Sequence, residues 1–290
     1  MSDQITNVDV RHDFVLLFDV TDGNPNGDPD AGNLPRVDPE TMQGLVTDVC
    51  LKRKVRDYVA AQHAEEAGYD IFVKHHGVLY NEQEKAYEAL DIEDSSDDSR
   101  AQEARKWMCA NFYDVRAFGA VMSTTEFNCG QVRGPLQFTL GRSIDPVVPQ
   151  DLSITRVAVT RTGEEKETEM GRKALIPYGL YRAQGFFNPH LAEDTGFSAD
   201  DLEVFWEALP RMWELDRSAA RGLMACRGLF VFTHSSPLGD APAHRLFDLI
   251  EVRRRNAVTA PRSFSDYQVT VDEDALGDYD GKVTLTRVGY

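Results

Sequence analysis

Cysteine is scarce in this sequence, and long apolar runs are missing. The four cysteines, Cys50, Cys109, Cys129 and Cys226, are far apart and form no C-x-x-C pair. This spacing argues against a zinc cluster or a disulfide framework and favours a reducing compartment. No window holds the roughly 18 apolar residues that a membrane-spanning helix requires, and the polar N-terminal residues lack a signal-peptide pattern. We therefore expect a cytoplasmic protein with no membrane partner.

Basic residues are also in short supply. The chain has 31 Lys and Arg against 48 Asp and Glu, for a net charge of −17. Nucleic-acid-binding domains normally carry a basic surface, so the total charge favours a protein that avoids nucleic acid. Charge beyond about 8–10 Å is screened at physiological salt, however, so a local basic groove could still bind a nucleic acid. Basic residues gather at 52–56, 133–142, 156–173, 211–227 and 253–262, and acidic ones at 82–103 and 272–280.

Apolar residues are plentiful enough for a folded core. They make up 42% of the chain, and aromatic residues make up 10%, which argues against disorder. The 290 residues suffice for one large domain or two small ones.

The clearest local pattern lies near the N-terminus. An apolar run over 13–20 predicts a buried strand. The sequence Asn-Pro-Asn-Gly-Asp-Pro follows and predicts turns within a long loop, 21–46. Thr47 or Asp48 is a suitable N-cap for a helix over about 47–64.

This predicted helix has an apolar face and a basic flank. Leu51 and Val55 belong to the apolar face, whereas Lys52, Arg53 and Arg56 share the opposite flank. A helix N-terminus with three cations in its first turns suits a phosphate backbone. The pattern therefore predicts an anion-binding surface at the start of this helix.

The same stretch carries a family resemblance. The first strand, the Asn-Pro-Asn-Gly-Asp-Pro loop and the Leu51-Lys52-Arg53 helix resemble the backbone subunit of type I-C CRISPR Cascade, in the Cas "seven" family of the RAMP superfamily. The similarity extends over about 10–235, and the residues from 245 on match no family that we can name. Further fragments that agree are Asp114–Val121, Arg133–Phe138, Arg142–Pro146 and Tyr178–Tyr181.

The expected fold is α+β, with a ferredoxin-like (RRM-like) split βαβ core. Strands over 13–20, 69–73, 173–184 and 228–234 alternate with helices in the order β-α-β, insertion, β-α-β. We expect a single domain over 1–290 with a palm, a helical finger insertion, a β-hairpin thumb and a C-terminal extension. The predicted bounds are 13–74, 108–142 and 173–235 for the palm, 75–107 for the finger, 143–172 for the thumb and 236–290 for the extension.

Other segments give local predictions. Ser198 begins a helix with Asp201 as its reciprocal cap, and two alternating flanks around a polar turn predict a hairpin over 150–173. That hairpin is either a surface loop with a charged tip or an arm that reaches a neighbouring subunit or strand. We also expect helix over 81–106 with a break at 94–99, helix over 114–122, a glycine-rich loop over 128–135, helix over 211–227, and strands over 136–140, 267–271 and 283–288.

The resemblance implies a non-catalytic scaffold in antiviral defence. Several copies would line up along one guide CRISPR RNA (crRNA) and present it for pairing with target DNA, together with the repeat-processing, large and small subunits of Cascade. Neither a cofactor nor a metal is expected. The implied RNA contacts are Asn26, Arg36, Thr47, Lys52, Arg53, Arg56, Arg133 and Arg142, and the implied thumb contacts are Arg156, Arg161 and Met170.

Several alternatives stay open. Related RAMP subunits cleave RNA with an Asp in the loop after the first strand, so Asp28 or Asp30 could serve a metal-dependent ribonuclease, but His12 is the only His before residue 63. Asp22 could join these two carboxylates around a metal, although the spacing is not that of an EF-hand. A small-molecule enzyme is a third alternative, but the sequence offers no nucleophile–base pair to support it. Two further questions are whether Tyr178 and Tyr181 stack on bases or pack in the core, and whether Arg253–Arg255 contact RNA or a subunit, or lie on a solvated edge.

Overall fold

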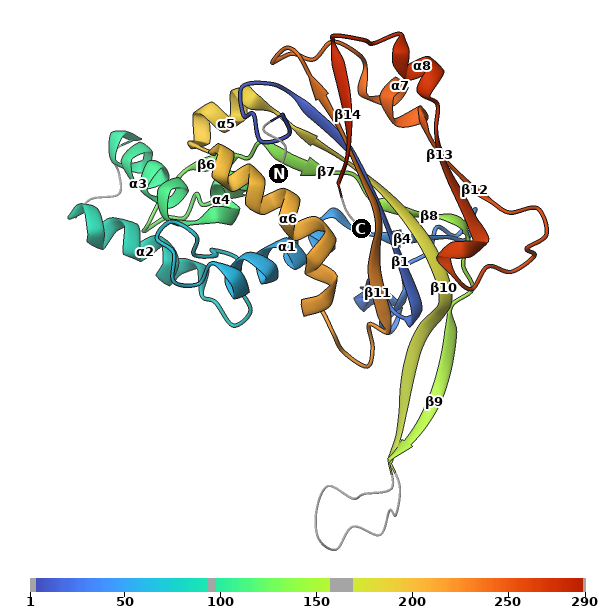
Figure 1. Ribbon diagram of the computed structural model, residues 1–290. Coiled ribbons are helices and arrows are strands. Elements are labelled where there is room, and N and C mark those ends of the chain that lie inside the picture. The colour runs from blue at the N-terminus through green and yellow to red at the C-terminus, as the bar shows by residue number, and fades with distance from the viewer. Residues whose placement is uncertain (1–3, 93–97, 157–168, 289–290) are drawn as a thin grey trace, which may run out of the picture.

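The computed structural model describes residues 4–92, 98–156 and 169–288. Its centre is an eight-stranded antiparallel sheet with the strand order β14-β11-β1-β10-β8-β4, in which β7 and β9 also pair with β10. Helices α1 and α6 cover one face, and the C-terminal segment covers the other (Figure 1). The strands are β1 (His12–Gly23), β4 (Gln43–Val46), β7 (Leu136–Phe138), β8 (Gly141–Pro146), β9 (Gln150–Arg156), β10 (Glu169–Phe187), β11 (Leu223–His234) and β14 (Val283–Val288).

Strand β1 lies in the middle of the sheet because both of its faces are apolar. Phe14 and Phe18 pack toward the helices, whereas Val15 and Leu17 pack toward the C-terminal segment. Alternate residues of a strand point to opposite faces, so a continuous apolar run suits a strand that is covered on both sides. The strand predicted over 13–20 is confirmed.

The two helices on the first face begin where their caps predict. Helix α1 (Asp48–Gln62) has Thr47 as its N-cap, and α6 (Ala199–Leu215) begins with a capping box between Ser198 and Asp201. The apolar side of α6 packs on the sheet, and the ring of Trp213 stacks on Phe18 at 4.7 Å. Both predicted helix starts are confirmed.

A second, smaller core lies beside the sheet. It contains Phe72, Tyr87, Met108 and Phe112 and is separate from the main core. Its elements are α2 (Leu79–Leu90), α3 (Asp98–Asn111), α4 (Tyr113–Phe118) and the hairpin of β5 (Gly119–Val121) and β6 (Gln131–Arg133). The helical prediction over 81–106 agrees with α2 and α3.

Segment 69–73 is not a strand, which corrects one prediction. Among the described residues, this segment makes a single bridge, between Asp70 and Phe112. The backbone N–H groups of Phe72 and Val73 donate to the carboxylate of Asp114 and are not available for strand pairing. Strands β7 and β8 pair with β10, and segment 69–73 is not part of the sheet.

Three further boundaries differ from the predictions. The helix predicted over 114–122 ends at Phe118, because Gly119 has a φ of 82° and the chain continues into β5. The loop predicted over 128–135 contains β6, which pairs with β5. The helix predicted over 211–227 is only the last turn of α6, which ends at Leu215, and β11 begins at Leu223.

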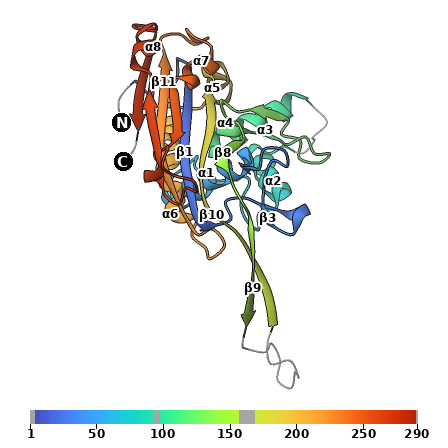
Figure 2. The same ribbon diagram turned by 90° about the vertical axis from the view of Figure 1, so that its right-hand side faces the viewer.

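Strands β9 and β10 form an arm that extends away from the body (Figure 1, Figure 2). They pair antiparallel from Gln150, opposite Leu175, to Arg156, opposite Glu169. The alternation over 150–173 therefore predicted a real hairpin. Its tip, 157–168, lies outside the described residues.

The C-terminal segment folds against the second face of the sheet. The predicted strands over 267–271 and 283–288 are confirmed as β13 and β14. No helix in the described parts of the chain is long and apolar enough to span a membrane. The other elements of the segment are α7 (Ala243–Asp248), β12 (Ile250–Arg254), η2 (Phe264–Asp266), β13 (Tyr267–Val271) and α8 (Glu273–Gly277).

Candidate nucleic-acid interface

The turn-rich loop after β1 is joined directly to the start of α1. The side-chain oxygen of Asn26 accepts hydrogen bonds from the backbone N–H and the hydroxyl of Thr47, both at 2.9 Å. The hydroxyl oxygen of Thr47 in turn accepts from the N–H of Cys50 at 3.2 Å. Asn26 and Thr47 therefore form one unit that fixes the loop against the N-terminus of the helix.

A buried lysine of α1, Lys54, is linked to this loop through Asp216 and Arg221. Burial lowers the pKa of Lys54 to about 8, and its ammonium group pairs with Asp216. Arg221 contacts the same carboxylate at 3.3 Å and donates to the carbonyls of Asn24 and Pro25 at 3.0 and 2.9 Å. Sequence reasoning missed this support, since Lys54 and Asp216 are 162 positions apart.

Lys52 and Arg53 lie on the first turns of α1, as predicted, but they differ in solvent exposure and in their partners. Lys52 is 13% exposed, and its ammonium group donates to the side-chain oxygen of Gln137 at 2.8 Å and pairs with Asp48 at 3.3 Å. Arg53 is 58% exposed and lies 3.3 Å from Asp57. Arg53 is thus the more accessible cation on this helix.

The turn that follows Arg133 is linked to α1 through Gln137. The side-chain amide of Gln137 donates to the carbonyl of Gly134 at 3.1 Å, one residue beyond Arg133, while its oxygen accepts from Lys52. Arg133 is exposed at the end of β6. The start of α1 and the β6–β7 turn are thus linked, and we group the predicted contacts that they carry as the α1 surface: Asn26, Thr47, Lys52, Arg53 and Arg133.

Arg56 does not belong to this surface, contrary to the helical-wheel prediction. Its side chain is only 10% exposed, and its Nε lies 2.6 Å from the carboxylate of Asp114. The guanidinium group also lies over the ring of Phe118, 5.3 Å from its centre. Helix α4, which carries Asp114 and Phe118, covers this side of α1 and buries a residue that an isolated helix would expose.

Arg142 lies on the other face of the sheet. Tyr181 stacks on Phe18 on the helix side, so the next residue, Arg182, points the opposite way. Arg142 pairs with Arg182 across the strands and therefore shares that face. There it makes an ion pair with Asp38 at 3.0 Å.

Asp28, one of the carboxylates proposed for a metal, is already engaged. The carboxylate of Asp28 accepts from the N–H of Asp30 at 3.2 Å and lies 3.4 Å from Arg36. No group of three or more potential metal ligands occurs within the described ranges. His12 begins β1 at the end opposite this loop, about 35 Å away at 3.3 Å per residue. It therefore cannot act as a general base beside Asp28.

The expected arm contacts are described only in part. Met170 is 79% exposed and lies opposite Thr155 in the hairpin. Arg156 ends β9, and its side chain is not among those described, whereas Arg161 lies outside the described residues. The tyrosine question is answered, because Tyr178 and Tyr181 are both buried and pack in the core.

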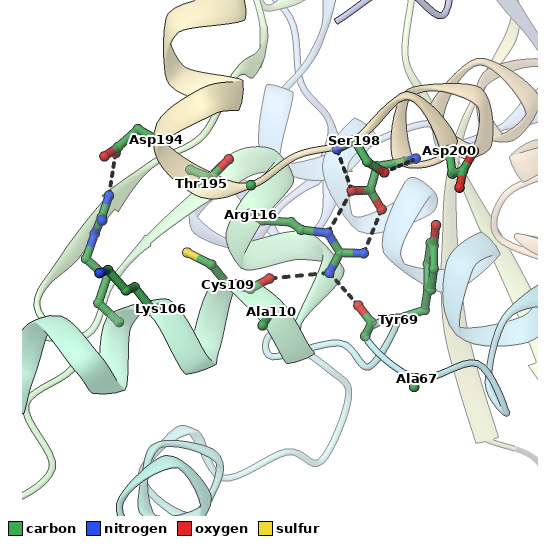
Figure 3. A pocket seen from close by; sticks show the side chains of 14 residues that line it. Ala67, Tyr69, Lys106, Cys109, Ala110, Arg116, Asp194, Thr195, Ser198 and Asp200 are labelled. Atoms are coloured by element: carbon green, nitrogen blue, oxygen red, sulfur yellow. Dashed lines mark hydrogen bonds and ion pairs between the residues drawn. The ribbon is translucent and has the colours of Figure 1, made fainter. Parts of the chain in front are cut away.

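A cavity of about 540 Å³ lies between α3 and the start of α6 (Figure 3). Arg116 reaches into it from α4 and makes two hydrogen bonds to Asp201, at 2.9 and 2.6 Å. It also donates to the carbonyls of Gly68 and Cys109. These bonds use the donors of Arg116 internally, so we assign it a structural role.

Comparison with known proteins identifies the family. The family described as CRISPR-associated protein Cas7 matches residues 10–272. The chain belongs to the Cas7 family. A protein of Haloferax volcanii with the same description is 30% identical over 224 residues, which is 69% of this chain and 64% of that protein. The chain thus aligns with less than two thirds of that relative's length.

Solved structures support the Cas7 fold. A chain of a "CRISPR RNA-guided surveillance complex, pre-nicking" aligns with a TM-score of 0.51 at 15% identity and covers 80% of this chain and 79% of its own. A chain of a "CRISPR RNA-guided surveillance complex" aligns with a TM-score of 0.51 at 14% identity, over 88% and 78%. At these identities the likeness concerns the fold alone. The resemblance to the Cas7 family read from the sequence is confirmed, and the family match extends beyond residue 235, to residue 272.

Proposed function

We propose that this Cas7 protein is a non-catalytic, crRNA-binding backbone subunit of a type I-C Cascade complex in the cytoplasm. Copies of the chain assemble along one guide RNA, and the complex presents that guide to target DNA. The observation that carries the proposal is the α1 surface, where a helix N-terminus and three cations meet in a member of the Cas7 family. The repeat-processing, large and small subunits are its further partners.

The fold is consistent with a palm, a finger and a thumb. The central order β11-β1-β10-β8, with α1 and α6 on one face, supports a split βαβ palm. We assign the finger to the small core around α2 and α3, and the thumb to the arm with Arg156, Arg161 and Met170. The contacts needed are sequence-independent, since base pairing with the guide reads the target.

The charge distribution is compatible with this role despite the net charge of −17. Phosphate contacts come from local cations, and acidic surfaces farther than about 10 Å are screened. Arg53 and Arg133 are exposed on the α1 surface, and Lys52 can turn from Gln137 toward a phosphate. We retain Arg36 as a flanking contact. Arg56 and Arg142 have less support, because one is buried and the other lies on the opposite face.

The ribonuclease alternative has weaker support. Asp28 accepts a hydrogen bond from the backbone and faces Arg36, so it is not poised to bind a metal. Divalent-dependent cleavage of guide-matched RNA, lost in Asp28→Ala or Asp30→Ala, would reverse this choice.

The test is co-expression with a CRISPR array and the partner subunits, followed by extraction of nucleic acid from the purified protein. We expect a discrete guide-length RNA in a large assembly. Lys52→Glu with Arg53→Glu should lose that RNA while the protein still folds. Arg245→Glu with Lys282→Glu is the charge-matched control, because both residues are exposed on the C-terminal segment. Equal retention in the two double variants would refute the proposal.

A further inference from the structure

The arm leaves the body through two strands, and the C-terminal segment holds both of them at their roots. Strand β8 ends at Pro146, four residues before β9 begins, and β10 runs without a break from the arm into the sheet. Figure 1 shows β12 and β13 beside these strands, on the side from which the arm leaves. We call the segment Ile250–Val271, which contains β12, η2 and β13, the C-terminal clamp.

The first root is held through Asp145. The hydroxyl of Tyr267 donates to its carboxylate at 2.8 Å, and Arg254 pairs with the other carboxylate oxygen at 3.3 Å. Tyr267 is buried, and this burial, with Asp145 beside it, raises the pKa of the phenol well above its usual range. The phenol of Tyr267 therefore stays protonated at neutral pH and donates its hydrogen bond to Asp145, five positions before the arm begins.

The second root is held through Tyr178 on β10. Its ring lies 6.3 Å from that of Tyr267, and its hydroxyl donates to the buried carboxylate of Asp19 at 2.9 Å. Arg227 pairs with the same carboxylate at 2.8 Å and lies over Phe264 of η2, 5.6 Å from the ring centre. The clamp thus touches both strands at the level where they leave the sheet.

The opposite side of the root is held by backbone contacts and by the buried apolar side chains of Val147 and Ile176, which belong to the main core. The N–H of Val147 donates to the carbonyl of Met42 at 2.8 Å, and Gly23 pairs with Ile176. Apolar packing has no preferred direction, whereas a hydrogen bond and an ion pair to one carboxylate fix the orientation of the strand that carries it. The clamp supplies such polar contacts to β8 through Asp145, and it packs the ring of Tyr267 beside Tyr178 of β10.

We propose that the C-terminal clamp sets the direction of the arm, with Tyr267 and Arg254 as positioning residues. Uniformly directed arms let successive copies repeat at a constant interval along one strand. That consequence rests on the proposed function, whereas the effect on arm direction does not. The clamp also explains two members of the arginine run at 253–255: Arg254 pairs with Asp145, and Arg255 donates to the carbonyl of Ser265 at 2.9 Å.

The test measures arm direction in the RNA-free, full-length protein. Spin labels are placed at Met170→Cys on the arm and His190→Cys on the body, with the native cysteines replaced, and the distance distribution is recorded. We expect Tyr267→Phe with Arg254→Gln to widen it about twofold, because the root loses its fixed partners. Tyr267→Phe alone keeps the ring packing and should widen the distance distribution less than the double variant does. Arg254→Lys, with Tyr267 intact, keeps a cation beside Asp145 and should leave the distribution as narrow as in the wild type.

The matched control is Arg253→Gln, on the same strand but 75% exposed and paired with Glu251 of that strand. An unchanged width in the folded double variant, or equal widening in Arg253→Gln, would overturn the proposal. Guide retention is measured separately. If the Lys52→Glu, Arg53→Glu variant loses its RNA but keeps a narrow distance distribution for the arm, the loss bears on the α1 surface and not on the clamp. If both proposals hold, the clamp variant retains its RNA but loses regular spacing in a nuclease footprint.

Discussion

Arg56 and Asp114 are 58 positions apart in the sequence and form a buried ion pair, with 2.6 Å between Nε and Oδ2. The same carboxylate accepts hydrogen bonds from the N–H groups of Phe72 and Val73. Arg116, two residues further on, binds Asp201 at the start of α6. The short helix α4 thus joins the main core to the smaller one through two buried charges.

Removing the guanidinium of Arg116 should strongly destabilise the fold. Arg116→Met leaves the carboxylate of Asp201 buried without its cation, and breaking such a pair costs about 3–5 kcal/mol. Urea unfolding measures the change. The control is Arg105→Ala, which breaks a pair with the half-exposed Asp194 and should cost about 0–1 kcal/mol. Similar losses in the two variants would contradict a special role for the Arg116 pair.

Arg56 and Arg53 should respond in opposite ways to the same substitution. Arg56→Gln removes a buried partner of Asp114 and should lower the free energy of unfolding by about 3 kcal/mol. Arg53→Gln changes an exposed site, so stability should stay within about 0.5 kcal/mol while RNA affinity falls and its salt dependence weakens. Unfolding and RNA titration on both variants test this. If folded Arg56→Gln bound RNA more weakly than wild type while Arg53→Gln bound it as tightly as wild type, the assignment of Arg53 as the RNA contact would be reversed.

The Asn26–Thr47 unit should behave as one element. Thr47→Ala removes the N-cap of α1 and should cost about 1 kcal/mol. Asn26→Ala removes the acceptor for the same hydroxyl, so the double variant should cost less than the two single losses added together, by about 0.5 kcal/mol or more. A thermal or urea double-mutant cycle measures this coupling. Strict additivity would show that the loop and the cap are independent.

His12 should make the protein sensitive to mild acid. Burial, opposed in part by a hydrogen bond to the carbonyl of Asn7, lowers its pKa from 6.5 to about 4. Between these values the unfolded chain binds a proton that the folded protein does not, so stability falls as the pH drops from about 6.5 to 4. The loss from this group is about 3 kcal/mol.

The measurement is urea unfolding of wild type and His12→Gln at pH 7.5 and pH 4.5. The difference between the two proteins isolates His12 from its neighbours Asp13 and His234, and it should shrink at low pH. His190→Gln is the control, because His190 is exposed. A difference that does not change with pH would show that His12 is not buried as a neutral ring.

Gly185 should not tolerate a methyl group. A Cβ at this position would lie 2.0 Å from the ring of Phe14, which is packed between β10 and the helices. Overpacking of this kind costs about 1–3 kcal/mol or more. Gly277→Ala is the matched control, since nothing lies within 4 Å of its Cβ. Equal unfolding midpoints for the two variants would contradict the close contact.

Much of the fold could be predicted because its signals are local. The apolar run of β1 requires cover on both faces, Thr47 and the Ser198–Asp201 pair fix two helix starts, and alternation predicts β13 and β14. Each depends on residues within a few positions of one another, so no tertiary information is needed. The order of the motifs likewise sufficed to recognise the family.

The errors arose where a distant partner decides the outcome. Segment 69–73 reads as a strand, but the carboxylate of Asp114 takes its N–H groups. The helical pattern of α1 places Arg56 on a solvated flank, yet helix α4 covers that flank and supplies an acid. Short apolar segments and charged residues are ambiguous by themselves, because pairing and burial depend on what packs against them.

The sequence by itself determined the central strand and the caps of the two main helices, because each follows from neighbouring residues, and the Cas7 family, because the order of its motifs along the chain is specific. Only the tertiary structure decided which cations are exposed. Lys54 and Arg56 are paired with acids far away in the sequence, Arg142 lies on the opposite face, and Arg53 and Arg133 remain exposed on the α1 surface. A buried charge is stable only beside its partner, and folding brings those partners together.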